Sequence, residues 1–423
     1  MINGVLGVHR FWRYTIRFDD LGIAERLSTM AYGDVSDAET HPHLLASIDS
    51  VSGSATAASG LEKQDSSPWR SLPNDILDQA LALLPLPDVF RVRSVCKRWN
   101  SVIHCAQFQE LSLRSSVSWG PFYSPRVGWK GQGSRSVLWS SYDLSEGKWI
   151  TMPQFEFPVC AQSSSWNLLA ANGGLFCFGA SDGPRRILVC NPMTKTWREL
   201  PSVNMDYSAR VVMVTHMIVD ELRSSYKILF AGTATVDLYD SVTNKWNAAE
   251  KLSAGLSFRS GAYCNGEIYL LTKLLSSGLY SVMILDLTNL RWKESTILIP
   301  PSFAKYPYIV ACSGQVYLVG GSSETTDTMP MGSIGLFQLD PSGRWNKVSE
   351  YSNHAFLRST GAIYGCGAHR GKIYVVTYAY DMWVAVYNCA SGFWEEPIKG
   401  NFFDMKDIFE TKFAFQPNLR VAP

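Results

Sequence analysis

The chain has 423 residues, which is long enough for more than one domain and for a large buried core. Its 38 lysines and arginines nearly balance its 37 aspartates and glutamates, so the overall charge does not favour binding to nucleic acid or to an anionic membrane. Hydrophobic residues make up 46% and charged residues 18%, which is typical of globular proteins. Because no apolar run is long enough to span a membrane and the N-terminus lacks an apolar leader, we expect neither a transmembrane segment nor a secretory signal.

The first 66 residues differ in composition from the rest of the chain. The stretch 28–67 is rich in serine, holds six acidic residues against one lysine, and has almost no large apolar side chains. Such a segment cannot bury enough apolar surface to offset the entropy lost on ordering. The sequence therefore predicts a disordered N-terminal tail over residues 1–66.

Residues 69–110 have a helical period. Pro85 and Pro87 are expected to end a first helix, Asp88 to cap a second, and Ser94 to cap a third that carries Trp99. Three short helices make a very small core, so a leftover apolar face on this unit is predicted to be a docking surface. The first helix is predicted from apolar residues spaced three and four apart, namely Ile76, Leu77, Ala80, Leu81 and Leu84.

From Ser134 onward the period changes to alternation, and an internal repeat appears. Successive repeat tryptophans lie 48, 49, 46, 53 and 49 residues apart, and an Asp or Asn precedes the tryptophan by six residues in five of the six copies. A period near 50 residues with alternating strands is typical of a β-propeller of the kelch kind. The repeat tryptophans are Trp149, Trp197, Trp246, Trp292, Trp345 and Trp394.

Each repeat predicts a fixed series of strands. The Asp or Asn is expected to accept backbone N–H bonds in a tight turn, and the tryptophan to pack between neighbouring sheets. The first repeat is short on its N-terminal side, and an open ring would leave a sheet edge unpaired. We therefore expect the alternating segment Thr411–Gln416 to supply a strand to the sheet that contains Tyr142–Trp149.

The chain has nine cysteines and seven histidines. The number of cysteines is odd and no C-x-x-C pair occurs, which predicts reduced thiols in a cytoplasmic and/or nuclear protein. No histidine pair has the spacing to two cysteines that a zinc site needs. We expect no metal and no cofactor.

Two segments resemble known families. The Leu72–Pro73 opening, the LPLPD break at Leu84–Asp88 and the VCKRWN segment at Val95–Asn100 resemble an F-box, and the six repeats resemble kelch repeats. Their order is similar to that of the plant F-box/kelch-repeat proteins, with features related to the leaf-curling-responsiveness type. The expected fold is mainly β, with a six-bladed kelch-type propeller over 116–420, a small all-α three-helix F-box over 67–112 and the disordered tail over 1–66.

The resemblance implies the substrate-recognition subunit of an SCF-type (Skp–cullin–F-box) ubiquitin ligase. The F-box would bind a Skp-type adaptor and through it a cullin-RING ligase, while the propeller would hold a protein substrate for ubiquitination. An alternative is an F-box scaffold or transcriptional cofactor that does not promote degradation. Trp99 fits the internal packing of the helical unit, and a purely local core is the alternative for the implied adaptor contacts. These contacts are Leu72, Pro73, Ile76, Leu77, Leu84, Leu86, Pro87, Val95 and Cys96.

Catalysis has little support in the sequence. The dominant Asp-to-Trp spacing differs from the five residues of sialidase Asp boxes, and His216, His354 and His369 fall in different repeats, where nothing predicts a copper site. A propeller enzyme stays the alternative to a non-catalytic receptor. A basic cluster over 91–98 permits nucleic-acid binding, but such charges are more often solvated or face a protein partner, so we expect no nucleic-acid or membrane partner.

Three arginines precede predicted first strands of the repeats. Arg210, Arg259 and Arg358 are spaced by one and two repeat lengths, so we expect them at one end of the propeller channel. There they could bind carboxylate or phosphate groups of a substrate segment. The alternative is that each arginine pairs with an acid or carbonyl of a neighbouring blade.

Overall fold

The computed structural model describes residues 73–114 except 83 and 85, then 123–130, 134–143, 148–156, 166–180, 186–203, 214–232, 235–252, 255–293, 297–303, 305–322, 333–352, 360–379, 382–400 and 418–423. The tail predicted to be disordered therefore lies outside the described residues. The chain divides into two compact units, one up to Ser118 and one from Trp119. We call them the helical unit and the propeller.

The helical unit contains four described helices, so the prediction of three was wrong. They are α3 (Asn74–Ala82), α4 (Leu86–Val92), α5 (Lys97–Ile103) and α6 (Ala106–Arg114). The break between α5 and α6 falls at His104 and Cys105, where the Cys105 Sγ accepts a hydrogen bond from the Phe108 N–H at 3.4 Å. This hydrogen bond caps the first turn of a new helix, so the chain does not continue α5.

The two predicted caps also differ from the structure. The N-cap of α5 is Cys96, whose Sγ accepts from the Trp99 N–H, whereas the Ser94 hydroxyl donates to the Arg91 carbonyl. Asp88 lies inside α4, with its carboxylate buried and paired with Arg91 at 2.6 Å. Cysteine is a weak hydrogen-bond acceptor, so sequence rules for caps, which favour Ser and Asp, pointed to the wrong residues.

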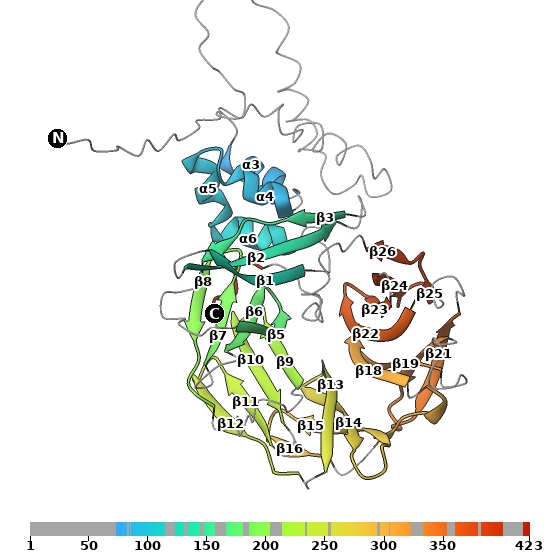
Figure 1. Ribbon diagram of the computed structural model, residues 1–423. Helices are drawn as coiled ribbons and strands as arrows, with labels where there is room; N and C mark the ends of the chain where they lie inside the picture. Colours follow the sequence, from blue (N-terminus) through green and yellow to red (C-terminus); the bar gives the residue numbers. More distant parts are fainter. Residues whose placement is uncertain are drawn as a thin grey trace, which may run out of the picture. The chain divides into compact units, whose positions relative to one another are not determined.

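The propeller is mainly β, and five of its sheets share one plan (Figure 1). Each has four antiparallel positions in chain order, and the first strands β5, β9, β13, β18 and β22 face a common centre. In two sheets the outermost position is split between two short strands. The strands are β5 (Trp166–Asn172), β6 (Leu175–Ala180), β7 (Ile187–Asn191) and β8 (Thr196–Glu199); β9 (Val214–Asp220), β10 (Ser225–Ala231), β11 (Val236–Asp240) and β12 (Lys245–Ala248); β13 (Leu256–Cys264), β14 (Glu267–Leu274), β15 (Tyr280–Asp286), β16 (Arg291–Trp292) and β17 (Ile297–Leu298); β18 (Lys305–Cys312), β19 (Gln315–Gly321), β20 (Ile334–Leu339) and β21 (Trp345–Tyr351); β22 (Thr360–His369), β23 (Lys372–Ala379), β24 (Met382–Asn388), β25 (Phe393–Trp394) and β26 (Ile398–Gly400).

The remaining sheet is incomplete within the described residues. Its strands are β1 (Tyr123–Lys130), β2 (Ser134–Asp143), β3 (Lys148–Thr151) and β4 (Phe155–Glu156), and both β3 and β4 pair with β2. Tyr142 pairs with Trp149 as Tyr239 pairs with Trp246, so β1 and β2 correspond to the second and third strands of the other sheets.

The prediction of a six-bladed propeller therefore needs correction. The described residues form five complete four-position blades and one sheet without a first strand. The predicted closing segment Thr411–Gln416 lies outside the described residues, so its assignment stays a prediction.

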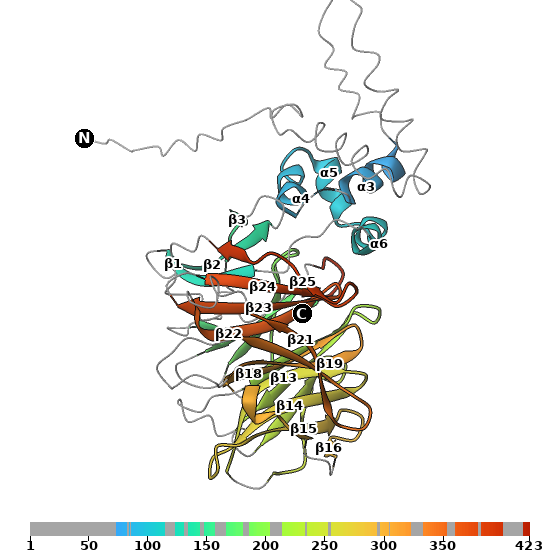
Figure 2. The same cartoon turned by 90° about the vertical axis from the view of Figure 1, so that its right-hand side faces the viewer.

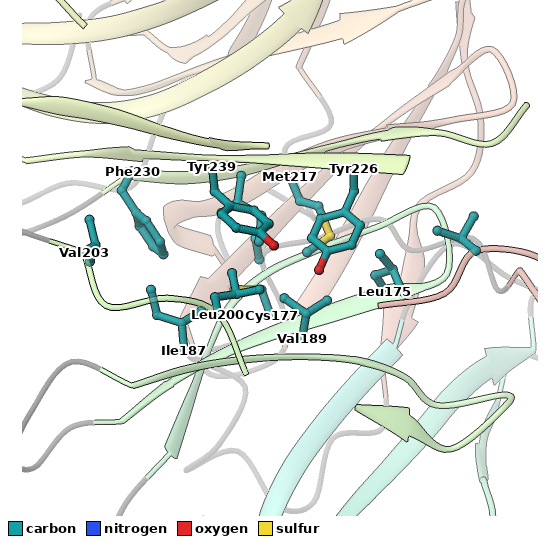
Figure 3. Close-up of a cluster of buried hydrophobic side chains, with 13 residues drawn as sticks. Leu175, Cys177, Ile187, Val189, Leu200, Val203, Met217, Tyr226, Phe230 and Tyr239 are labelled. Atoms are coloured by element: carbon teal, nitrogen blue, oxygen red, sulfur yellow. The ribbon is translucent and has the colours of Figure 1, made fainter. Parts of the chain in front are cut away.

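Neighbouring sheets pack through continuous apolar cores. In Figure 3, Cys177 and Val189 of β6 and β7 face Tyr226, Phe230 and Tyr239 of the next sheet. Figure 2 shows the same succession from the side, where β22, β18 and β13 lie in consecutive sheets. Alternation along each strand directs one row of side chains into each core, which is why the repeat could be read from the sequence.

The predicted turn chemistry is confirmed. The Oδ1 atom of Asp240 accepts hydrogen bonds from the N–H groups of Val242 and Thr243 at 2.8 and 3.3 Å, and Asn191 and Asn388 make the same pairs of bonds in their own sheets. Asp340 accepts from the Ser342 N–H and hydroxyl and the Arg344 N–H, and these bonds lower its pKa to about 2. The repeated acid or amide thus holds the turn before the last strand.

Three repeat tryptophans connect one sheet to the preceding one. The indole Nε1 of Trp246 donates to the Pro201 carbonyl at 2.8 Å, and that of Trp292 donates to the Glu250 carbonyl at 2.8 Å. Trp394 donates to the Ser349 hydroxyl at 2.9 Å. The sequence predicted packing between sheets; the structure adds a hydrogen bond across the same junction.

Replacing Trp246 by Ala is expected to lower the free energy of unfolding by about 3 kcal/mol, at the low end of the range for tryptophan because the ring is half-buried. The change removes ring contacts to Phe230 and Tyr239, whose centroids lie 5.2 and 5.3 Å away. Urea denaturation measures the loss. Val242→Ala, in the same hairpin and 77% exposed, serves as the control and should change stability by less than about 0.5 kcal/mol.

The C-terminal segment Asn418–Pro423 packs against sheets whose strands lie far from it in the sequence. Leu419 and Val421 are 4% and 1% exposed, and Val421 belongs to the core shown in Figure 3. The Asn191 Nδ2 donates to the carbonyls of Asn418 and Val421 at 2.7 and 2.8 Å. A Cβ on Gly174 would lie 2.6 Å from the Asn418 Cβ, so the absence of a side chain there permits the close approach.

Candidate adaptor-binding and substrate-binding sites

The implied adaptor contacts do not all lie on the surface of the helical unit. Pro73 and Cys96 are exposed, Val95 is 37% exposed and Ile76 is half-buried. Leu72 lies outside the described residues, and Leu86 and Pro87 belong to α4 without described side chains. The exposed positions flank the start of α3 and the start of α5.

Leu77 and Leu84 are core residues. They are 1% and 0% exposed and are buried in the helical unit together with Trp99. For these two leucines the local-core alternative fits the structure better than direct docking. The helical period identified an apolar face but could not tell its inner part from its outer part, because both follow the same spacing.

The basic cluster over 91–98 is largely used within the helical unit. Arg98 donates to the Asn74 Oδ1 through Nε and Nη2 at 3.2 and 2.9 Å. Arg93 contacts His104 at 3.3 Å and lies over the Phe90 ring at 5.6 Å. These contacts join α3 to α5 and the end of α4 to the end of α5, so the charges have structural partners.

Asp78 was missed by the sequence analysis. It is 4% exposed, its Oδ2 accepts a weak bond from the Cys105 thiol at 3.8 Å, and its Oδ1 has no hydrogen-bond partner within the described ranges. Burial raises the pKa of this carboxyl above its ordinary value. Its position three residues before Leu81 on the predicted helix was the available signal for burial.

Replacing Asp78 by Asn is expected to stabilise the helical unit at pH 7 by about 1 kcal/mol. A carboxyl whose pKa is higher in the folded than in the unfolded state becomes increasingly destabilising as the pH rises through the range between the two pKa values. The gain should therefore disappear below about pH 4, where the carboxyl is protonated in both states. Hydrogen exchange of the α3 amides, compared between wild type and variant at each pH, measures it; lower protection in the variant would contradict the prediction.

The first strands of the five complete blades surround a cavity of about 600 Å³. It is lined by residues of β5, β9, β13, β18 and β22, among them His216, Arg259, Tyr263 and Tyr308. Among the described residues that line the cavity, Arg259 is the one with a full charge. None of these lining residues is an aspartate or glutamate. Burial lowers the pKa of His216 to about 4, so this imidazole is neutral at pH 7.

Arg259 occupies an irregular position in β13. The register between β13 and β14 shifts between Phe258 and Ser260, which leaves Arg259 as the bulged residue. A bulge redirects a side chain relative to the regular alternation, and here the side chain is exposed at the cavity. Within the described residues the guanidinium forms no ion pair, and its role as a substrate contact stays a prediction.

The other two predicted substrate contacts, Arg210 and Arg358, lie outside the described residues. The arc of three arginines thus stays a prediction, with one member placed at the cavity. His354 is also outside the described residues. Among those described, no three His, Cys, Asp or Glu side chains form a cluster that could hold a metal ion.

The described cysteines are free thiols, and half of them are buried. Cys177, Cys190, Cys264 and Cys312 are buried, whereas Cys96 is exposed and Cys105, Cys366 and Cys389 are half-buried. No described helix is long and apolar enough to cross a membrane.

A small helical unit followed by a β-propeller defines a two-part protein, and both parts match known families. Residues 69–108 match the F-box domain, and residues 141–388, more than half of the chain, match the KIB1-4 beta-propeller. The chain is thus an F-box protein of the plant F-box/kelch type. It belongs to the KIB1-4 beta-propeller family.

Several curated plant proteins are similar to the chain. F-box only protein 6 of Arabidopsis thaliana is 27% identical over 64% of this chain and 55% of the relative. An F-box/kelch-repeat protein of the same plant is 25% identical over 83% of this chain and 90% of the relative. Protein UNUSUAL FLORAL ORGANS of Arabidopsis thaliana is 25% identical over 64% of each chain. The chain thus spans about half the length of the first relative and most of the second.

Proposed function

We propose that the protein is the substrate-recognition subunit of an SCF-type ubiquitin ligase, in which the helical unit binds a Skp-type adaptor and the propeller binds a protein substrate. The observation that carries the proposal is the combination of an F-box match over 69–108 with a separate propeller that has a charged, solvent-accessible cavity. Adaptor docking uses the exposed part of the apolar surface, at Pro73, Ile76 and Val95. The protein performs no catalysis of its own.

Affinity purification with mass spectrometry tests the proposal. The full chain and a chain lacking residues 67–112 are purified from plant cells with and without a proteasome inhibitor. The full chain should retain a Skp-type adaptor and a cullin, the deletion should lose both, and both should retain the same substrate. Substrate that accumulates when the proteasome is inhibited supports degradation. Substrate whose level is unchanged would instead favour the scaffold or cofactor alternative.

The cavity arginine is proposed to bind a carboxylate or phosphate group of the substrate. Replacing Arg259 by Ala should lower substrate recovery about tenfold or more, because a charge-assisted hydrogen bond contributes about 1.5–3 kcal/mol, and should leave adaptor recovery unchanged. Arg223→Ala is the matched control, because its side chain is 84% exposed in the turn after β9. Equal recovery with Ala at position 259 would show that this arginine does not contact the substrate.

A further inference from the structure

One end of the β13–β17 sheet exposes a group of large apolar side chains. Leu275, Leu279 and Leu298 are 63%, 60% and 67% exposed, and Leu274 and Tyr306 are 39% and 45% exposed. We call these five residues the leucine rim. Isolated exposed leucines are ordinary on protein surfaces, whereas a contiguous apolar group marks an interaction site.

The strand register places the rim residues at the same end of their strands. Leu274 pairs with Leu256 at the start of β13, and Leu298 pairs with Ser281 at the start of β15. The hairpin between β14 and β15, which carries Leu275 and Leu279, lies at that same end. Tyr306 is at the start of β18, which is joined to β13 by a bond from the Ile309 N–H to the Ser260 hydroxyl at 3.0 Å.

The hairpin that carries three of the leucines is held in place by backbone hydrogen bonds. The Leu275 N–H donates to the Gly255 carbonyl at 2.8 Å, which ties the hairpin to the segment before β13. Within the hairpin, the Leu274 and Gly278 N–H groups donate to the Leu279 and Leu274 carbonyls at 2.9 and 2.8 Å. A surface fixed in this way loses little conformational entropy when a partner binds.

The described charged side chains beside the rim are cationic. Residues 255–259, 272–280, 297–303 and 305–308 contain Arg259, Lys273 and Lys305 but no aspartate or glutamate. Glu250 bonds to Leu290 in the turn at the other end of β15, so it and its neighbour Lys251 are not part of this group. The Lys273 ammonium lies over the Tyr280 ring at 5.3 Å, which keeps it beside the hairpin. Turns at the opposite end are mixed, since Asp220 pairs with Arg223 and Asp240 with Lys227.

We propose that the leucine rim binds an acidic segment of a partner protein, with apolar side chains on the leucines and carboxylates toward the surrounding cations. Leucine and lysine side chains together also suit an anionic membrane, but Arg259 lies in the cavity between the blades, where a flat lipid surface does not reach and an extended polypeptide does. This proposal rests on the proposed function, because it takes the partner to be a protein. It adds the chemistry of the segment that the propeller recognises.

The test begins with a library of random 16-residue peptides displayed on phage and selected on the immobilised full chain. Enriched peptides should combine Asp or Glu with Leu, Ile or Phe. The most enriched peptide, synthesised with a fluorescent label, should bind the double variant Leu275→Glu/Leu279→Glu at least about tenfold more weakly than wild type, measured by fluorescence anisotropy. The matched control Leu222→Glu/Val242→Glu changes two aliphatic residues that are 85% and 77% exposed in turns at the opposite end, and should bind within about twofold of wild type.

Several outcomes would overturn the inference. The first is a library that yields no enriched peptide, or none with acidic residues. The second is equal affinity of the peptide for wild type and the rim variant. The third is binding of wild type, but not of the rim variant, to vesicles containing phosphatidylserine. If circular dichroism shows that the Glu variant is unfolded, Leu275→Ser/Leu279→Ser replaces it in the same measurement. Co-purification of the adaptor with each variant is recorded in parallel, so that a failed rim with intact adaptor binding is distinguished from failure of the proposed function.

Discussion

Removing residues 418–423 is expected to destabilise the propeller by about 3–6 kcal/mol, a large part of a typical total of 5–15 kcal/mol. Leu419 and Val421 are almost fully buried, and burial of each such side chain contributes about 1.5–3 kcal/mol. The deletion also removes the two carbonyls to which the Asn191 Nδ2 donates. The loss of these two hydrogen bonds adds a further cost.

Thermal and urea denaturation of the full-length and truncated chains measures this effect. Val421→Asp should cause a comparable loss, because it places a charge in the apolar core between the two sheets. Arg420→Ala is the control, since the Arg420 side chain is exposed and only its backbone bonds to the propeller. A truncated chain that melts at the wild-type temperature would show that the segment does not dock in solution.

The second large effect concerns adaptor binding. Replacing Pro73 and Val95 together by Ala is expected to abolish co-purification of the Skp-type adaptor while the helical unit stays folded, because both side chains are exposed. Leu72→Ala alone is also expected to weaken adaptor binding. Cys96 is left unchanged because its thiol caps α5.

Two further variants separate docking from folding. Leu77→Ala should lower stability by about 2–5 kcal/mol, because that leucine is 1% exposed, and any loss of adaptor binding should accompany unfolding. Gln107→Ala, exposed on α6, should affect neither property. Adaptor binding that survives the Pro73 and Val95 changes, with circular dichroism unaltered, would remove these residues from the docking surface.

The local features of both units could be predicted from the sequence. Helical spacing from Ile76 to Leu81 marked α3, although the helix ends at Ala82, before the predicted Leu84. The recurrent Asp or Asn before each tryptophan marked the turn before a final strand. These features follow from interactions within a few residues of the chain, namely side-chain periodicity and side-chain bonds to the next backbone N–H groups. Local rules were less successful where an unusual residue type caps a helix, as Cys96 and Cys105 do.

The tertiary structure alone decided which of these residues face inward and what meets across long distances. Leu77 and Pro73 are both implied adaptor contacts, yet one is core and the other is surface, because burial depends on where the neighbouring helices lie. The bulge at Arg259 depends on the register of two strands, and the contact of Asn191 with Val421 joins residues separated by 230 positions. Spacing along the chain carries no information about such contacts, since they arise only when separate elements pack together and bury a common core.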